Sequence, residues 1–182
     1  MGLTAVTLIY SPWGLRSGAH MNPATTLTFA LRGKVAAVDA VFYVISQFVG
    51  GAMGVMLARL LLGETLRHAA VDHVVTQPGS RGVRVAWLAE LVIAFGMMLM
   101  VLVASNTPAI AGYTGMLAGV LVALYITLEA PLSGMSLNPA RTFASAIVAR
   151  RWRAMWVYFT APLAGMLLAS AAYAAVPGMP EV

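Results

Sequence analysis

Long uninterrupted runs of apolar residues dominate the pattern of hydrophobic and polar positions in this chain. Positions 91–128 and 154–180 contain no charged residue. Each of these runs is longer than the roughly 20 residues that a membrane-spanning helix requires. Polar and turn-forming residues divide the chain into segments that predict four full spans, at residues 35–62, 85–104, 112–130 and 155–176. The pattern therefore predicts an all-α membrane protein.

Two further apolar segments are too short to be full spans. Residues 23–31 and 139–149 each begin with the Pro of an Asn-Pro pair. The longer segment makes only ~16 Å of helix at ~1.5 Å per residue, which is about half of a ~30 Å hydrocarbon core. Asn is a favoured N-cap residue, and Pro suits the first helical position because its missing N–H is not needed there. The sequence therefore predicts two half-length helices.

These half-length helices belong to an internal repeat. Residues 17–26 read Ser-Gly-Ala-His-Met-Asn-Pro-Ala-Thr-Thr, and residues 133–142 read Ser-Gly-Met-Ser-Leu-Asn-Pro-Ala-Arg-Thr, so Asn138 follows Asn22 by 116 residues. Interrupted helices at corresponding positions of two apolar halves are typical of a binding or conduction site in a membrane protein. We expect a single membrane domain over residues 1–182, with an incomplete first repeat at 1–62, a connecting loop at 63–84 and a second repeat at 85–182.

The paired motifs resemble those of the aquaporin, or major intrinsic protein, family. One Asn-Pro-Ala is a weak signal, because Asn-Pro favours turns anywhere. Two copies in the context Ser-Gly-x-x-x-Asn-Pro-Ala, the second followed by Arg141, are specific. The resemblance implies an inverted-repeat helical bundle whose half-helices meet at the bilayer centre, acting as a passive channel for water and small uncharged solutes such as glycerol or urea. It also implies a homotetramer in the plasma, or inner, membrane.

The resemblance assigns roles to individual residues. The pore motifs are Asn22, Pro23, Ala24, Asn138, Pro139 and Ala140. The selectivity filter falls on Ile126, Met135 and Arg141, and its fourth position falls at or before Met1. Backbone carbonyl groups that line the path belong to Gly18, Ala19, His20, Gly134, Met135 and Ser136. An Arg at membrane depth is costly, so Arg141 is also a functional candidate on physical grounds.

The resemblance leaves the preferred solute open. Ile126 stands where strict water channels commonly have His, which implies a wider and less polar filter. Thr142 stands where glycerol-type members carry Asp. The aromatic pair Tyr158-Phe159 before Pro162 is closer to the water type.

The first apolar segment is too short for a span. As a helix, residues 1–10 reach only ~15 Å. A chain that began in mid-bilayer would leave backbone groups unpaired in hydrocarbon. The resemblance therefore implies an N-terminally truncated family member that lacks the first span and part of the second. This leaves a non-conducting remnant or packing subunit as an alternative to the channel.

Two glutamates in the apolar runs bear on another alternative, a secondary transporter. Broken helices and inverted repeats also occur in transporters, but no acidic residue flanks either Asn-Pro-Ala in the sequence. Glu90 and Glu129 are candidates for proton coupling, because ionisable residues inside a membrane are functional by default. The resemblance instead implies that Glu90 holds loop backbone.

Composition excludes several other classes. Apolar residues make up 60% of the chain and charged residues only 9%, against about 25% in soluble domains. The net charge of +5 comes from Arg residues at the ends of apolar runs, where interface anchoring explains them better than nucleic-acid binding. Cysteine is absent, and His68 and His73 have no supporting ligand cluster. We therefore expect no metal, no cofactor and no enzyme activity.

Overall fold

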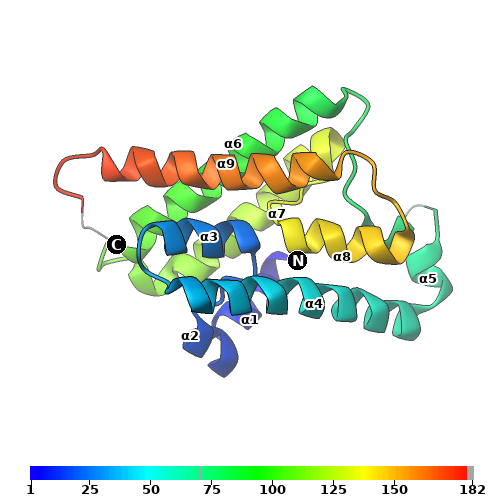
Figure 1. Cartoon of the computed structure of the whole chain (residues 1–182), viewed down its shortest axis with the longest axis horizontal. Helices are drawn as coiled ribbons and strands as arrows, with labels where there is room; N and C mark the ends of the chain where they lie inside the picture. Colours follow the sequence, from blue (N-terminus) through cyan, green and yellow to red (C-terminus); the bar gives the residue numbers. More distant parts are fainter. Residues whose placement is uncertain (70, 180–182) are drawn as a thin grey trace.

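The computed structural model describes residues 1–69 and 71–179, and this part of the chain consists of helices joined by turns and loops (Figure 1). Two short 3-10 turns lie at Asp72–Val74 and Ala111–Tyr113. The α-helices are α1 (Gly2–Ile9), α2 (Pro12–Ser17), α3 (Pro23–Leu31), α4 (Ala37–Leu62), α5 (Glu64–Arg67), α6 (Val83–Ser105), α7 (Thr114–Ser133), α8 (Pro139–Ala149) and α9 (Met155–Ala174). Four of them, α4, α6, α7 and α9, are long and apolar enough to cross a membrane. The predicted four spans and two half-helices are confirmed.

The core forms where α6 packs along α9. Gly165 of α9 faces the backbone of α6, and a Cβ atom at this glycine would lie 3.0 Å from the Cβ of Ala94. Ala161 and Ala169 lie one helical turn to either side of Gly165 and are fully buried. Small residues at such spacing let two membrane helices approach closely. The α6–α9 pair is thus packed closely enough to form the centre of the core.

The half-helices α3 and α8 lie end to end in the middle of the molecule. Figure 1 shows them in line between α9 above and α4 below, with their N-terminal ends facing each other. Each one contacts both α4 and α9, so long helices support both sides of the pair. Each half-helix therefore points its positive end at the same central region.

The internal repeat of the sequence is matched by a pair of equivalent hydrogen bonds. The Tyr43 hydroxyl donates to the carbonyl oxygen of Ser17 at 2.9 Å. In the second repeat, the Tyr158 hydroxyl donates to the carbonyl oxygen of Ser133 at 2.6 Å. Ser17 and Ser133 open the two repeated motifs, 116 residues apart. Both loops are therefore fixed in the same way by the helix that follows their half-helix.

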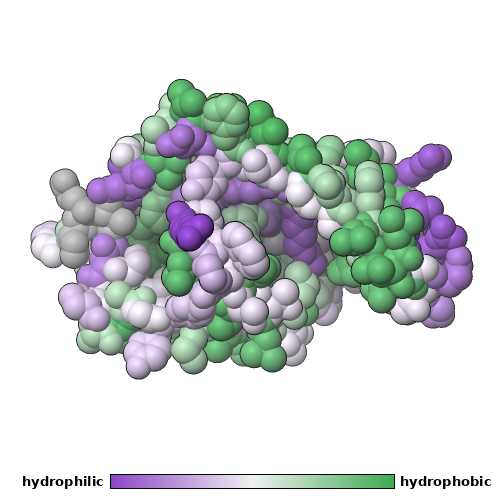
Figure 2. Space-filling view, turned by 90° about the horizontal axis from the view of Figure 1, so that it is seen from below, coloured by the Kyte–Doolittle hydropathy of each residue, from purple (hydrophilic) through white to green (hydrophobic). Residues whose placement is uncertain are grey.

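The outer face of α4 is open. The structure places Gly51 of α4 against α8, since a Cβ there would lie 3.3 Å from the Cβ of Ala144. Among the described residues, nothing lies within 4 Å of a Cβ built at Gly50 or Gly54. Large exposed residues along this helix include Phe42, Val49, Met53, Leu57 and Leu60. Such a surface suits hydrocarbon, and Figure 2 shows hydrophobic residues above and to the right of a hollow that contains hydrophilic ones.

Two local features differ from the sequence interpretation. The segment after Tyr10 is not only a break, because it forms the short helix α2. Ser11 caps this helix by accepting a hydrogen bond from the N–H of Gly14 at 3.0 Å, and Gly18 ends it in the left-handed region. The predicted end of the third span at residue 130 is also too early. Helix α7 continues through Pro131 to Ser133, and Gly134 closes the helix with φ of 82°.

Candidate functional site at the paired half-helices

Each half-helix begins at the Asn-Pro pair that the sequence predicted. The Oδ1 atom of Asn22 accepts a hydrogen bond from the N–H of Ala24 at 2.9 Å. The Oδ1 atom of Asn138 accepts from the N–H of Ala140 at 2.9 Å and from that of Arg141 at 3.2 Å. These bonds satisfy N–H groups that have no partner within a helix. The predicted capping role of both asparagines is confirmed.

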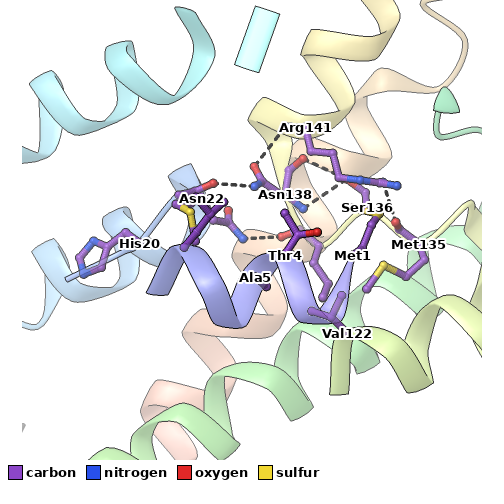
Figure 3. Close-up of a pocket in the computed structure, with 13 residues that line it drawn as sticks. Met1, Thr4, Ala5, His20, Asn22, Val122, Met135, Ser136, Asn138 and Arg141 are labelled. Atoms are coloured by element: carbon purple, nitrogen blue, oxygen red, sulfur yellow. Dashed lines mark hydrogen bonds between the residues drawn. The ribbon is translucent and has the colours of Figure 1, made fainter. Parts of the chain in front are cut away.

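The two asparagines also tie the repeats together. Asn22 Nδ2 donates to the carbonyl oxygen of Leu137 at 2.7 Å, and Asn138 Nδ2 donates to the carbonyl oxygen of Met21 at 2.7 Å (Figure 3). Each side chain thus caps its own helix and holds the loop before the other helix. A side-chain amide has two N–H groups, so each asparagine keeps one further donor.

The loops before the two half-helices share an unusual backbone. Residues with positive φ are Gly18, Ala19 and Met21 in the first loop and Gly134, Met135 and Leu137 in the second. The corresponding residues are 116 apart. A non-glycine residue in the left-handed region costs about 1–3 kcal/mol, and such strain persists only where the surroundings enforce it. The repeat therefore keeps a strained backbone in both halves.

Glu90 of α6 holds the second loop. One carboxylate oxygen accepts from the hydroxyl of Ser133 and from the N–H of Ser136, both at 2.6 Å. The other accepts from the N–H of Leu137 at 2.8 Å. Glu90 is fully buried. The interpretation of Glu90 as a support for loop backbone is confirmed.

A buried chain of hydroxyl groups links the connecting loop to the second motif. Ser136 Oγ donates to the carbonyl oxygen of Asn138 at 2.9 Å. Ser136 Oγ lies 2.6 Å from the Thr142 hydroxyl, which lies 2.7 Å from the Thr76 hydroxyl, so the three groups form one hydrogen-bonded chain. Sequence reasoning missed Thr76, which is 66 residues from Thr142 and carries no recognisable motif.

The first loop uses an aromatic contact and a different hydrogen-bond pair. The His20 ring stacks on Phe29 with centroids 5.2 Å apart, and its Nδ1 lies 3.2 Å from Thr26 Oγ1. Gln47 of α4 donates to the same Thr26 hydroxyl at 2.9 Å. His20 is thereby fixed next to Asn22.

A cavity of about 320 Å³ opens between the two loops. Its lining residues are Met1, Thr4, Ala5, Leu8, His20, Met21, Asn22, Val122, Met135, Ser136, Leu137, Asn138 and Arg141. Both asparagines therefore reach one cavity from opposite half-helices (Figure 3). The structure brings together His20, Met135 and Ser136 from the predicted carbonyl residues, whereas Gly18, Ala19 and Gly134 do not line the cavity.

The predicted filter residues do not all meet at this cavity. Arg141, in the first turn of α8, donates from a guanidinium nitrogen to the carbonyl oxygen of Met135 at 2.6 Å, and both residues line the cavity. Ile126 does not line it, but packs against a buried cluster that includes residues of α6 and α9 together with Met135 and Leu137. Val122, one helical turn earlier on α7, occupies the cavity wall.

The electrostatics of the cavity favour acceptors over cations. Each helix N-terminus carries roughly half a positive charge, and both point to this region. Arg141 adds a full positive charge at the cavity wall. Within residues 1–69 and 71–179, no group of three or more His, Asp or Glu side chains is placed to hold a metal ion.

The two tyrosine bonds offer a matched stability test. Replacing Tyr158 with Phe leaves the buried carbonyl of Ser133 without its donor, so we expect a loss of about 1–3 kcal/mol in the free energy of unfolding. Replacing Tyr43, whose bond to Ser17 is not buried, should cost less than about 1 kcal/mol because the carbonyl of Ser17 is less desolvated. Denaturant titration of both purified variants measures this, and equal losses would contradict the assigned roles.

Fold and site together define an all-α integral membrane protein with two inverted repeats, whose half-helices meet head to head at one cavity. The family model described as Major intrinsic protein matches residues 1–173. The chain therefore belongs to the major intrinsic protein family.

Named relatives and a solved structure agree with this assignment. Aquaporin NIP1-2 of Oryza sativa subsp. japonica is 35% identical over 175 residues, which cover 94% of this chain and 57% of the relative. Aquaporin NIP1-2 of Arabidopsis thaliana is 34% identical, with 90% and 56% covered. The chain thus spans little more than half the length of these relatives. The X-ray structure of the aquaglyceroporin from Plasmodium falciparum has the same fold, with a TM-score of 0.76 at 19% identity, covering 87% of this chain and 73% of that one.

Proposed function

We propose that this protein is a passive transmembrane channel for water and small uncharged solutes such as glycerol or urea. The observation that carries the proposal is the reciprocal bonding of Asn22 and Asn138, which aims two helix N-termini and two spare amide donors at one cavity. A solute that passes there needs acceptor atoms and no positive charge. Water and small alcohols or amides meet both requirements.

The same arrangement supports the exclusion of protons. A water molecule that accepts from the asparagine amides must donate its own protons away from the centre in both directions. This orientation interrupts a continuous chain of hydrogen-bonded waters, and dipoles and donors along a pore are a recognised barrier to protons and cations. Arg141 adds repulsion for cations at the wall.

The proposal includes the remaining roles and the context. The Asn-Pro-Ala motifs form the centre of the path, and Ile126, Met135 and Arg141 form its constriction. Residues 1–62 and 85–182 act as the two repeats of one domain, joined by 63–84. We place the protein in the plasma, or inner, membrane as a homotetramer.

A second candidate, a non-conducting packing subunit, is favoured by one observation. Only 6% of the most apolar part of α4 is buried, and Gly50 and Gly54 face open space among the described residues. A stripe of this kind is suited to contact with another membrane helix.

Water flux separates these candidates. The purified protein is reconstituted into liposomes, and shrinkage after an osmotic step is followed by stopped-flow light scattering. We expect water permeability above that of empty liposomes, and a glycerol gradient tests the larger solute. Permeability equal to that of empty liposomes, from protein shown to be inserted, would favour the packing subunit. Counterflow driven by an ion gradient would instead indicate a secondary transporter.

A further inference from the structure

Glu129 is a buried acid that the channel proposal does not use. It lies near the C-terminal end of α7 and is 5% exposed. Neither of its carboxyl oxygens has a hydrogen-bond partner in the described part of the chain. An ionised carboxylate in this condition would lose its hydration without compensation, which costs several kcal/mol even after relaxation. The protonated, uncharged form of this carboxyl group avoids that cost.

The donors around Glu129 are already committed. The nearest are the hydroxyl of Ser133, one turn later on α7, and the N–H of Met135. The Ser133 hydroxyl has a single proton and donates it to Glu90 at 2.6 Å. The N–H of Met135 donates to Ser133 Oγ at 3.1 Å. Both groups lie beside Glu129 but direct their protons elsewhere, so neither carboxyl oxygen has a hydrogen bond of good geometry. Ser133 Oγ keeps a lone pair that can accept one.

The charged and titratable groups that act on this acid come from three other helices. Helix α6 contributes Glu90, α8 contributes Arg141 and α9 contributes Tyr158, all within electrostatic reach. On α7 itself, Tyr125 directs its hydroxyl at Gly96 of α6. One arginine thus faces two carboxyl groups. Glu90, which accepts three hydrogen bonds, is the one that the surroundings stabilise as an anion.

We propose that Glu129 is a proton-binding site whose uncharged form keeps Arg141 on the carbonyl of Met135 and so maintains the cavity wall. When protonated, Glu129 leaves Glu90 and Arg141 as a balanced pair. When it loses the proton, a second negative charge faces Arg141, and the available donors are the guanidinium and the Ser133 hydroxyl. Movement of either group breaks a bond that holds the second loop, at Met135 or at Glu90.

The consequence for flux rests on the proposed channel function. Loss of the Arg141 bond changes the cavity wall, so water flux and proton leak of the wild type should change as the pH becomes alkaline. The variant Glu129→Gln has nearly the same shape and cannot ionise. Its flux should not respond to pH.

Infrared spectroscopy tests the proton site without reference to flux. The protein in lipid is titrated from neutral to alkaline pH, and the carbonyl stretch of protonated carboxylic acids is followed. We expect one such band at neutral pH in the wild type, its loss in alkali, and its absence from Glu129→Gln. The matched variants Glu64→Gln, at an exposed glutamate, and Glu90→Gln should both keep the band.

The outcomes separate the two proposals. A band that survives in Glu129→Gln, or that disappears in Glu90→Gln instead, would overturn the proton site. A wild type without such a band at neutral pH would overturn it as well. If the band behaves as expected but no variant conducts water, the proton site is supported and the channel proposal fails. If the variants conduct and the flux of Glu129→Gln still follows that of the wild type with pH, the coupling to the cavity wall is wrong.

Discussion

Replacement of Glu90 by leucine is expected to lower the free energy of unfolding by about 3–5 kcal/mol, because the change leaves a buried network without its anion. Three donors lose their acceptor at once, namely the Ser133 hydroxyl and the N–H groups of Ser136 and Leu137. Arg141 also loses the carboxylate that balances its charge. Leucine fills most of the volume of the glutamate side chain. The loss in the free energy of unfolding therefore comes from the hydrogen bonds rather than from a cavity.

The controls for Glu90→Leu are the variants Glu64→Leu and Glu90→Gln. Glu64→Leu removes an exposed glutamate whose ion pair with Arg67 is worth at most about 1 kcal/mol, so its unfolding should change little. Glu90→Gln keeps one carbonyl oxygen as an acceptor and should fall between wild type and Glu90→Leu. Unfolding of the purified variants in mixed micelles, followed by circular dichroism, gives the three values. A Glu90→Leu variant as stable as Glu64→Leu would show that Glu90 does not hold the loop.

Local chemistry explains why the half-helices could be predicted. An N-cap asparagine and a proline at the first helical position fix a helix start within two residues, so α3 and α8 begin where the sequence placed them. The four spans could be predicted from the length of the apolar runs, which is also a local property of the sequence. Both signals depend on residues that are neighbours in the chain.

The contacts that build the site could not be predicted in this way. The bond from Asn22 to the carbonyl of Leu137 joins residues 115 apart, and that from Thr76 to Thr142 joins residues 66 apart. Neither pair is marked by spacing or composition. The first depends on how the two half-helices face each other and the second on where the connecting loop packs, which only the packed structure defines.

The sequence alone also could not tell which residue of α7 lines the cavity. The family pattern places a filter residue at Ile126, which stays a prediction, and Val122, one turn earlier on α7, lines the cavity between the two Asn-Pro-Ala loops. Residues four apart lie on the same face of a helix, so periodicity cannot distinguish them. The depth at which α7 sits against its neighbours decides which of the two faces the cavity.

Replacement of Arg141 by valine is expected to increase proton and cation leak while water flux persists or rises. A unit charge acts on a cation 4 Å away with about 1 kcal/mol in water and about 4 kcal/mol at an effective dielectric constant of about 20. Removal of this barrier should raise the leak at least several-fold, since 1.4 kcal/mol is a factor of ten. The half-charges of the two helix N-termini remain, so the leak should stay below that of an unselective pore.

The measurement combines two signals from the same liposomes. An internal pH-sensitive dye reports proton entry under an imposed gradient, and light scattering reports water flux. Arg153→Val is the matched control, because it removes one positive charge from an exposed position that does not line the cavity. Arg141→Lys keeps the charge without the planar guanidinium, so its leak should stay close to wild type if charge is the cause. Equal proton leak from Arg141→Val and Arg153→Val, in variants with wild-type helix content, would remove Arg141 from its assigned role.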